Sequence, residues 1–582
     1  MNEARKKVLL AGLTAIVAVL GVVYFAGATR GDFEPRLHFG DATRSTDSSE
    51  TTVAVDALAA TNCRYGVGYV PDYSGSLAWV PTLDAGWYIN FGAQTWGAQV
   101  DSATFAPVVR LRQDRGPNGE RLPTYTFNPP LAYQYRGENG ELRDGVGKLV
   151  SSNRGHFWIV GNEVDVNNDV QDNTFPEVYA RAYHEAYTYI KKVDPTAKVA
   201  IAGLSMMTPG RLQYLSIVWD TYRSLYGTDM PVDIWNMHLY ILEERNPDNF
   251  MEYGDGKIAL GTDPALAKLT SYGDPQYCPA LGAADIPAND PRQDVYCRSE
   301  HDSVRIFREQ VYGMRQWMKA RGQQNKPLII SEYSLLYPYL GGTTGGQCEF
   351  LQDEHQQCFY PERVTKYLRD TVAFMEDTKD PNLGYPGDEN RLVQQWLWYS
   401  IVTEPNWSGG SSNLIVREFE SYAPGDPAAM TLMGQAFQQE ATARAGQSNL
   451  AGGVAYDVIA SAAYPGNKAS VTLTASFRNS GTRSIIDPVT VTFYSNPGLT
   501  QVIGSAVYDP ADTGAITGCT WDGRNSEHVS IRWNNLPVGT HTYWAKIDSP
   551  GSVPESSEGD NVTTAGTITV FANGLFVPVV SR

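Results

Sequence analysis

The chain has 582 residues, enough for two or three domains. Hydrophobic residues make up 42% of it, which excludes a chain that is disordered throughout. Its 46 Lys and Arg face 64 Asp and Glu, and the net charge of −18 argues against nucleic-acid binding because it would repel phosphates. Many aromatic residues (34 Tyr, 13 Trp) and only 19% charged residues suit neutral, polar, flat-faced ligands such as sugars.

Residues 8–28 form an apolar run, and three basic residues precede it at positions 5–7. A run of about 20 apolar residues can cross a bilayer as one helix whose basic flank stays inside. The small residues at 26–28 also fit a cleaved signal peptide, but the run is longer than the usual signal core. We therefore expect an exported protein, with residues 1–28 as a membrane anchor or signal segment and residues 29–60 as a flexible linker. An uncleaved anchor, the favoured reading, would tether it to the cell envelope.

Six cysteines agree with an oxidising compartment. Four lie inside two long predicted loops, where we expect local disulfides. These expected pairs are Cys278–Cys297 and Cys348–Cys358. Cys63 and Cys519 are far apart in sequence, and buried unpaired thiols are the favoured interpretation for these two. No CxxC or HExxH motif occurs, so we expect neither a metal nor a cofactor.

From residue 65 onward, short runs rich in β-branched and aromatic residues alternate with segments of helical period, the clearest helix being 175–193. The expected strands are 65–69, 86–91, 106–111, 157–161, 198–202, 233–239, 328–331 and 393–398. Eight strands separated by helices predict an α/β fold, a (β/α)₈ TIM barrel over residues 61–448. A doubly wound open sheet is the alternative, but no GxGxxG or Walker motif follows any strand, which argues against its nucleotide-binding form.

Residues 449–582 change character. Segments 470–478 and 489–494 alternate apolar and polar residues, which predicts an antiparallel, immunoglobulin-like β-sandwich. This part resembles bacterial cell-adhesion-related modules of the CARDB type. The resemblance is carried by segments 477–481, 491–494, 539–543 with Asp548, and 554–561. It implies a role in attachment or display and not in catalysis.

Two glutamates follow strongly apolar strands, Glu163 after 157–161 and Glu332 after 328–331. Working residues of a (β/α)₈ barrel lie where strands end, and a carboxylate there is costly unless it has a task or a partner. Two carboxyl groups across a barrel mouth suit glycoside cleavage, with one neutral acid and one ionised nucleophile. Taken singly, each glutamate could also be a salt-bridged rim residue.

At this point the chain resembles the clan A retaining glycoside hydrolases. The matching residues are Asn162-Glu163, Glu332, His238, Tyr240 and either Trp396 or Trp398. The resemblance implies that Glu163 is the acid/base, that Glu332 is the nucleophile and that Tyr240 steadies it. Segments 86–90, 161–165 and 326–332 look most like the clan's β-1,3-glucanase branch. Val164, where a Pro often follows the acid/base, and the long loops 243–301 and 341–359 depart from the pattern and leave the substrate open.

Further substrate-binding candidates surround these glutamates. Arg110 and Arg112 share one face of the third strand, so either could keep the nucleophile ionised, or both could form structural ion pairs. His238 could bond a substrate or a carboxylate, or be a core histidine. Trp398 could stack beneath a sugar ring or pack in the core. Asn90 and Asn162 complete the set.

The sequence thus predicts a retaining hydrolase of β-linked oligo- or polysaccharides. A non-catalytic glycan-binding or adhesion protein on a glycosidase-like barrel, and a structural surface-layer component, are the alternatives. The presence of both carboxylates favours the enzyme. Sugar identity, linkage, endo or exo action and oligomeric state are not predicted.

Overall fold

The computed structural model describes residues 60–94, 100–244, 258–270, 275–283, 295–336, 352–404, 409–458, 462–463 and 468–570. The expected anchor at 1–28, nearly all of the expected linker and Cys348 lie outside these residues. Within the described part of the chain, no helix has the length and hydropathy needed to cross a membrane.

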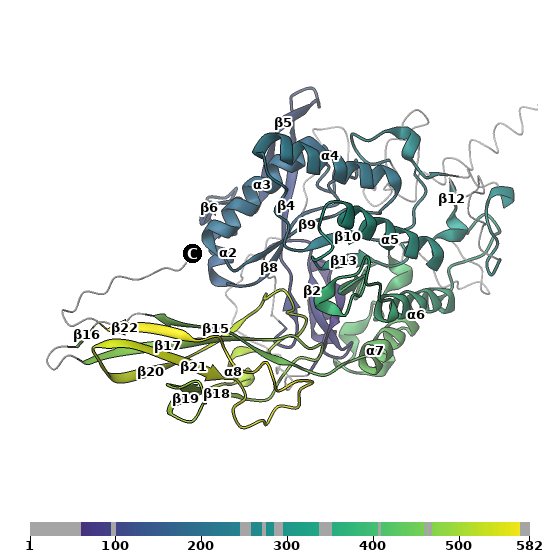
Figure 1. The fold of residues 1–582 in the computed structure, drawn as a ribbon. Coiled ribbons are helices and arrows are strands. Elements are labelled where there is room, and N and C mark those ends of the chain that lie inside the picture. The colour runs from purple at the N-terminus through teal and green to yellow at the C-terminus, as the bar shows by residue number, and fades with distance from the viewer. Residues whose placement is uncertain are drawn as a thin grey trace, which may run out of the picture.

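All eight expected strands are present, and Figure 1 labels β2, β4, β8, β9, β10 and β13 among them. They are β1 (Asn62–Gly68), β2 (Ala85–Ile89), β4 (Val108–Arg115), β8 (Phe157–Asn162), β9 (Lys198–Gly203), β10 (Trp235–His238), β13 (Leu328–Tyr333) and β14 (Gln395–Trp398). A short strand β3 (Thr104–Phe105) pairs with β2 and leads directly into β4. One sheet has the order β10-β13-β14-β1-β2-β3, another contains β4-β8-β9, and a parallel bridge from Ala200 to Ile234 links β9 to the start of β10. The pairs among these strands are parallel.

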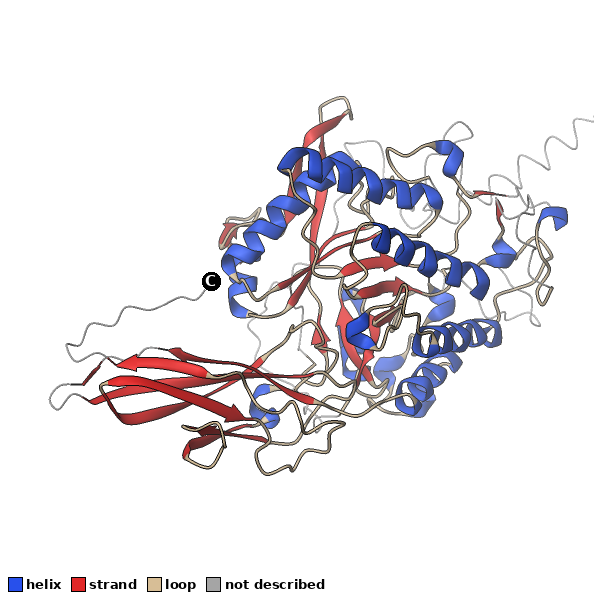
Figure 2. Cartoon of the chain, viewed as in Figure 1, coloured by secondary structure: helices blue, strands red, loops and turns tan. Residues whose placement is uncertain are grey.

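Helices lie between the strands in sequence and pack outside them (Figure 2). They are α2 (Val146–Ser152), α3 (Pro176–Val193), α4 (Pro209–Tyr226), α5 (Val304–Ala320), α6 (Pro361–Asp377) and α7 (Leu432–Ala443). Side chains of a strand alternate between its two faces. Accordingly Trp158 and Val160 of β8 belong to the large cluster that the helices cover, whereas Phe157 and Ile159 belong to a smaller cluster enclosed by the strands.

Some elements were not expected from the sequence. Strand β5 (Arg121–Asn128) pairs antiparallel with β4, and β6 (Gln134–Arg136) forms a hairpin with β7 (Leu142–Asp144). In the loop after β10, β11 (Leu269–Thr270) pairs with β12 (Val295–Tyr296). The expected disulfide between Cys278 and Cys297 is confirmed in this loop.

The C-terminal part consists of two antiparallel sheets, as predicted (Figure 2). One contains β15 (Leu450–Val458), β16 (Ala462–Ala463), β17 (Lys468–Asn479) and β20 (Glu527–Pro537), and the other contains β18 (Val489–Tyr494), β19 (Val502–Tyr508), β21 (Gly539–Lys546) and β22 (Gly566–Val570). Leu473 and Phe477 from the first sheet and Val491 and Phe493 from the second share one buried cluster. The four-residue helix α8 (Pro510–Thr513) was not expected.

The interpretation of Cys63 and Cys519 as unpaired thiols is wrong, because they form a disulfide across 456 residues of sequence. Spacing could not reveal it, because only the folded chain brings β1 beside the C-terminal sheets. Next to it, Arg524 donates a 2.8 Å hydrogen bond to Gln395, and its guanidinium lies 4.8 Å from the ring centroid of Phe157. Cys63, Gln395 and Phe157 all begin strands. The C-terminal sheets are therefore fastened at the amino ends of the strands, opposite the ends that carry Glu163 and Glu332.

Candidate active site

The two glutamates singled out in the sequence lie at the carboxyl ends of β8 and β13. Glu163 is 5% exposed and Glu332 is 9% exposed, so both carboxylates are largely removed from water. The chain leaves β8 through Gly161, whose φ of +92° belongs to a region that favours glycine. Glu163 itself has a φ of +46°. This turn brings the Glu163 side chain toward β10 and β13.

His238, the last residue of β10, lies between the two carboxylates, and Tyr240 follows two residues later. His238 Nδ1 lies 3.0 Å from Glu163 Oε1 and 3.7 Å from Glu332 Oε2. The Tyr240 hydroxyl donates a 2.7 Å hydrogen bond to Glu332 Oε1. One oxygen of Glu163, one of Glu332 and a ring nitrogen of His238 all lie within 4.8 Å of one another. The structure thus brings four of the predicted residues into one buried cluster.

A glycine makes room for the imidazole. A methyl group on Gly203, the last residue of β9, would lie only 2.1 Å from His238 Cδ2. Because this space is open, the His238 ring can lie between β9 and the carboxylates while its backbone N–H bonds the Leu204 carbonyl at 2.9 Å. No pattern in the sequence indicates this contact.

Burial sets the charge state of the cluster. Burial raises the pKa of Glu332 to about 7, and the nearby Glu163 carboxylate adds to the rise. His238, the Tyr240 hydrogen bond and the positive charge of Arg110 act in the opposite direction. Burial also lowers the pKa of His238, which favours its neutral imidazole.

The two arginine candidates differ. Arg110 Nε lies 2.5 Å from Asp172 Oδ1, and the other oxygen of Asp172 accepts a 2.8 Å hydrogen bond from the Asn162 backbone N–H. Arg110 therefore braces the chain beside Glu163 through Asp172, the structural ion pair that was the alternative, while its charge still lowers the pKa of Glu332. Arg112 instead donates to the Asp169 carbonyl in an exposed hydrogen bond.

The side chains of three other candidates form hydrogen bonds with neighbouring protein groups. The Asn90 amide bonds the Gln94 carbonyl at 2.7 Å and the Gly92 N–H at 3.0 Å, so it orders its own loop. The Asn162 side chain donates to Gln171 at 2.9 Å. Trp398 is fully buried and its indole N–H bonds the Ser412 carbonyl at 2.8 Å, so it packs in the core and offers no platform to a sugar ring.

Tyr399, to which the sequence reasoning gave no role, follows Trp398 and lies beside the cluster. Leu397 belongs to the cluster enclosed by the strands and Trp398 to the outer cluster, so strand alternation turns residue 399 inward again. The half-buried Tyr399 ring meets Phe91 edge-on at 5.7 Å and is close enough to contribute to the raised pKa of Tyr240. Counting residues along the strand could have found it.

A buried ionic network supports the cluster from one side. Asp165 accepts from Arg211 at 2.8 Å and from the Ser205 hydroxyl at 3.0 Å, and Arg211 also pairs with Glu244. Asp165, Ser205 and Glu244 lie in the loops after β8, β9 and β10. The network therefore holds three loops at the same end of the strands, and the sequence reasoning gave these residues no role.

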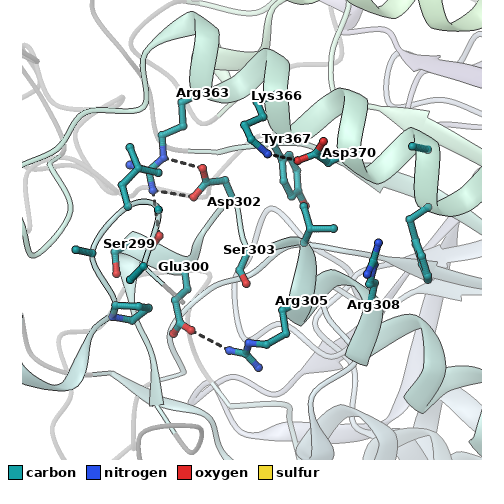
Figure 3. Close-up of a pocket in the computed structure, with 18 of the residues that line it drawn as sticks. Ser299, Glu300, Asp302, Ser303, Arg305, Arg308, Arg363, Lys366, Tyr367 and Asp370 are labelled. Carbon is teal, nitrogen blue, oxygen red and sulfur yellow. Dashed lines mark hydrogen bonds and ion pairs between the residues drawn. The ribbon is translucent and has the colours of Figure 1, made fainter. Parts of the chain in front are cut away.

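A cavity of about 1320 Å³ lies elsewhere, beside α5 and α6 (Figure 3). None of the four clustered residues lines it. Its charged groups neutralise one another, since Arg363 pairs with Asp302 at 2.7 Å and Lys366 pairs with Asp370. This cavity is therefore separate from the site formed by Glu163 and Glu332.

Among the described residues, three groups of side chains have the spacing of a metal site. One is Glu163, His238 and Glu332, and another is Asp548, Glu555 and Glu558 in the C-terminal part. A third group includes Cys278 and Cys297, whose sulfurs are joined in a disulfide.

No protein-family model matches the chain, and no curated protein sequence matches it. Among solved structures it is similar to a GH128 oligosaccharide-binding protein from Trichoderma gamsii, with 8% identity over 66% of this chain and 94% of that one and a TM-score of 0.33. It is also similar to a Cellulomonas fimi endo-β-1,4-mannanase double mutant, with 11% identity over 88% and 94% and a TM-score of 0.28. A Pyrococcus furiosus CARDB domain in complex with di-metal ions matches 22% of this chain and 91% of its own, with 13% identity and a TM-score of 0.16. These three TM-scores are below 0.5, so the similarity to these structures supports no particular function.

Proposed function

We propose that the protein is an exported retaining glycoside hydrolase that cleaves β-linked glycans on a (β/α)₈ barrel. Neighbouring parallel strands follow one another in the order β1, β2, β3, β4, β8, β9, β10, β13, β14 and back to β1, where β3 continues along the chain into β4. This order supports a closed barrel. In this proposal the catalytic domain spans residues 61–448 and the CARDB-like sandwich spans 449–582. Two disulfides fit an oxidising compartment outside the cytoplasm.

One observation carries the proposal: two buried carboxylates whose nearest oxygens lie within 4.8 Å. Retaining glycosidases hold their two carboxyl groups about 5 to 5.5 Å apart, whereas inverting ones leave about 6.5 to 9.5 Å for a water molecule. Oxygens of Glu163 and Glu332 within 4.8 Å fit the shorter, retaining separation better than the inverting one. This spacing therefore supports direct attack by one of the carboxylates.

The surrounding hydrogen bonds favour the proton on Glu163. A protonated Glu163 can donate to the neutral His238 Nδ1 at 3.0 Å, while the Tyr240 hydroxyl donates to an ionised Glu332. Once Glu163 is neutral, its charge no longer raises the pKa of Glu332. The pair thus holds one proton below about pH 7, with the acid and the nucleophile on different residues.

Catalysis then takes two displacements. In the first, Glu332 attacks the anomeric carbon, the glycosidic C–O bond breaks, and the leaving oxygen takes the proton of Glu163. In the second, Glu163 takes a proton from water, the water oxygen attacks the same carbon, and the bond to Glu332 breaks. Tyr240 holds the Glu332 carboxylate in place. Tyr399, and not Trp398, offers its aromatic ring to a sugar.

The test is incubation of the purified full-length protein with β-1,3-glucan, β-1,4-glucan, xylan and mannan, followed by product analysis. We expect new reducing ends from at least one glycan, and none from the same glycan with Glu332→Gln. If wild type cleaves no glycan but binds one, the adhesion function replaces the enzyme. Near-normal turnover by Glu332→Gln would refute the assignment of the nucleophile.

A further inference from the structure

His301 lies between the segments that follow Tyr240 and Glu332, at the end of the long loop after β10. Its side chain is 1% exposed. Its Nδ1 lies 2.7 Å from the Ile241 carbonyl oxygen, and its Nε2 accepts a 2.8 Å hydrogen bond from the Leu336 backbone N–H. Ile241 follows Tyr240 directly, and Leu336 comes soon after Glu332. One buried ring therefore joins the segment of the proposed nucleophile to the segment of its hydrogen-bond donor.

These two contacts fix the protonation of the His301 ring. Since a backbone N–H can only donate, Nε2 keeps its lone pair, and Nδ1 carries the hydrogen that meets the Ile241 carbonyl oxygen. Burial lowers the pKa of His301 to about 4, and the charge of Arg363 acts in the same direction, whereas the bond to Ile241 and the charge of Asp302 oppose it. The ring is therefore neutral near pH 7 and can form both bonds.

The backbone on both sides of His301 is anchored by charged side chains. Arg363, in the first turn of α6, donates to both oxygens of Asp302 at 2.7 Å and to the Ser299 carbonyl at 3.0 Å (Figure 3). Glu354, from the second long loop, accepts a 3.0 Å hydrogen bond from the Ser299 backbone N–H. The His301 ring is therefore held where the two segments meet.

His301 continues the connection between β10 and β13 beyond the end of their ladder. The described pairing of these strands ends at His238 and Glu332. Just past it, the Leu239 N–H bonds the Glu332 carbonyl at 3.0 Å, and the Tyr240 hydroxyl bonds the Glu332 carboxylate at 2.7 Å. From there onward the chain leaves the ladder, and His301 joins the two segments in its place.

We infer that His301 is a positioning residue, which holds the Tyr240 hydroxyl against the Glu332 carboxylate. The inference rests on the proposed function, because this contact affects turnover only if Glu332 is the nucleophile. A 2.7 Å hydrogen bond is lost when its two atoms move apart by about 1 Å, so a small shift of either segment would remove it. The long loops 243–301 and 341–359, which depart from the clan A pattern, thereby gain a role in ordering the site.

A double-mutant cycle on the full-length protein tests whether His301 acts through Tyr240. His301→Phe keeps a ring and loses both bonds, whereas His301→Gln offers a donor and an acceptor on one amide. On the glycan identified by the substrate panel, His301→Phe should lower kcat/KM about tenfold, and His301→Gln should recover most of the loss. In the Tyr240→Phe background, where the hydrogen bond is already absent, His301→Phe should lower kcat/KM less than about twofold.

Hydrogen exchange followed by mass spectrometry tests the two bonds of His301 without any substrate. In His301→Phe the amides of segments 235–242 and 328–336 should exchange about tenfold faster than in wild type, since a lost hydrogen bond corresponds to about a factor of ten. Those of α3 should exchange as in wild type. His184→Phe is the matched control, because His184 Nδ1 lies 2.8 Å from the Tyr222 hydroxyl between α3 and α4. It should change neither kcat/KM nor exchange in the two segments.

Unchanged exchange in both segments of His301→Phe, or unchanged kcat/KM, would overturn the inference. An equal loss of kcat/KM in both backgrounds, or faster exchange in α3 as well, would mean that His301 supports the fold and does not act through Tyr240. If wild type cleaves no glycan, the proposed function fails and so does the catalytic role of His301. Exchange would still show whether His301 joins the two segments.

Discussion

The Tyr240 hydroxyl donates a 2.7 Å hydrogen bond to Glu332 Oε1, and both side chains are buried. The bond favours the ionised carboxylate and lowers the pKa of Glu332. It therefore opposes the protonation of the proposed nucleophile that burial favours.

Replacing Tyr240 with Phe should lower kcat/KM about 10- to 100-fold, since a hydrogen bond to a charged group is worth about 1.5 to 3 kcal/mol. Kinetics on the glycan identified by the substrate panel would measure the loss. Tyr183→Phe is the control, because the buried Tyr183 hydroxyl bonds the Pro231 carbonyl at 3.0 Å, away from the carboxylates. Equal effects of the two substitutions would mean that Tyr240 only supports the fold.

The pH dependence of turnover should have a basic limb near pH 7, where the Glu163–Glu332 pair loses its last proton. Glu163→Ala removes both the acid and the charge that raises the pKa of Glu332. On an aryl glycoside with a good leaving group, which needs no acid, this variant should keep its activity above pH 7. Profiles of kcat/KM against pH for both proteins test this. A basic limb that persists unchanged in Glu163→Ala would contradict the shared proton.

Stability should respond to the same group. The raised pKa of Glu332, about 7 against the ordinary 4.5, means that the folded Glu163–Glu332 pair keeps one proton that the unfolded chain loses, so stability falls as the pH rises from about 4.5 to 7. Glu332→Gln carries no such charge. It should be more stable than wild type at pH 8, by up to about 3 kcal/mol, and nearly equal at pH 4.5. Urea unfolding at the two pH values measures the difference, and a variant that is less stable at pH 8 would show that the carboxylate is not strained by burial.

The disulfide between Cys63 and Cys519 should contribute strongly to stability because it closes most of the chain into a loop. Replacing both residues with Ala should cost about 2 to 5 kcal/mol. The comparison is the Ala double variant of Cys278 and Cys297, which are only 19 residues apart and should cost less on the chain-entropy account. Thermal unfolding would compare the stability lost in the two variants. A larger loss on removing Cys278–Cys297 would mean that the link between β1 and the C-terminal sheets contributes little to stability.

Much of the fold could be predicted from local patterns. Glu163 and Glu332 each come directly after a continuous apolar run in the sequence. The ends of these runs therefore indicated where the site lies. His238 and Tyr240 were found in the same way at the end of β10. These four residues meet because neighbouring parallel strands end at the same edge.

Contacts between distant residues could not be predicted in this way. Nothing near Cys63 in the sequence indicates that it pairs with Cys519. The need for glycine at position 203 is visible only in the folded chain, where the His238 ring fills the space beside it. Trp398 was left between two interpretations, a sugar platform and core packing, and strand alternation could have decided between them. Its residue type suggested a sugar platform, whereas the alternation of Leu397, Trp398 and Tyr399 along the strand decides which ring faces inward.

The stereochemistry of the first product tests the two-glutamate mechanism most directly. Proton NMR of a fresh digest, recorded before the sugar anomers equilibrate, shows which anomer the protein releases from a β-linked glycan. With Glu332 attacking and Glu163 acting as acid and then base, the first product should be the β anomer. Release of the α anomer would mean a single displacement by water and would contradict the account.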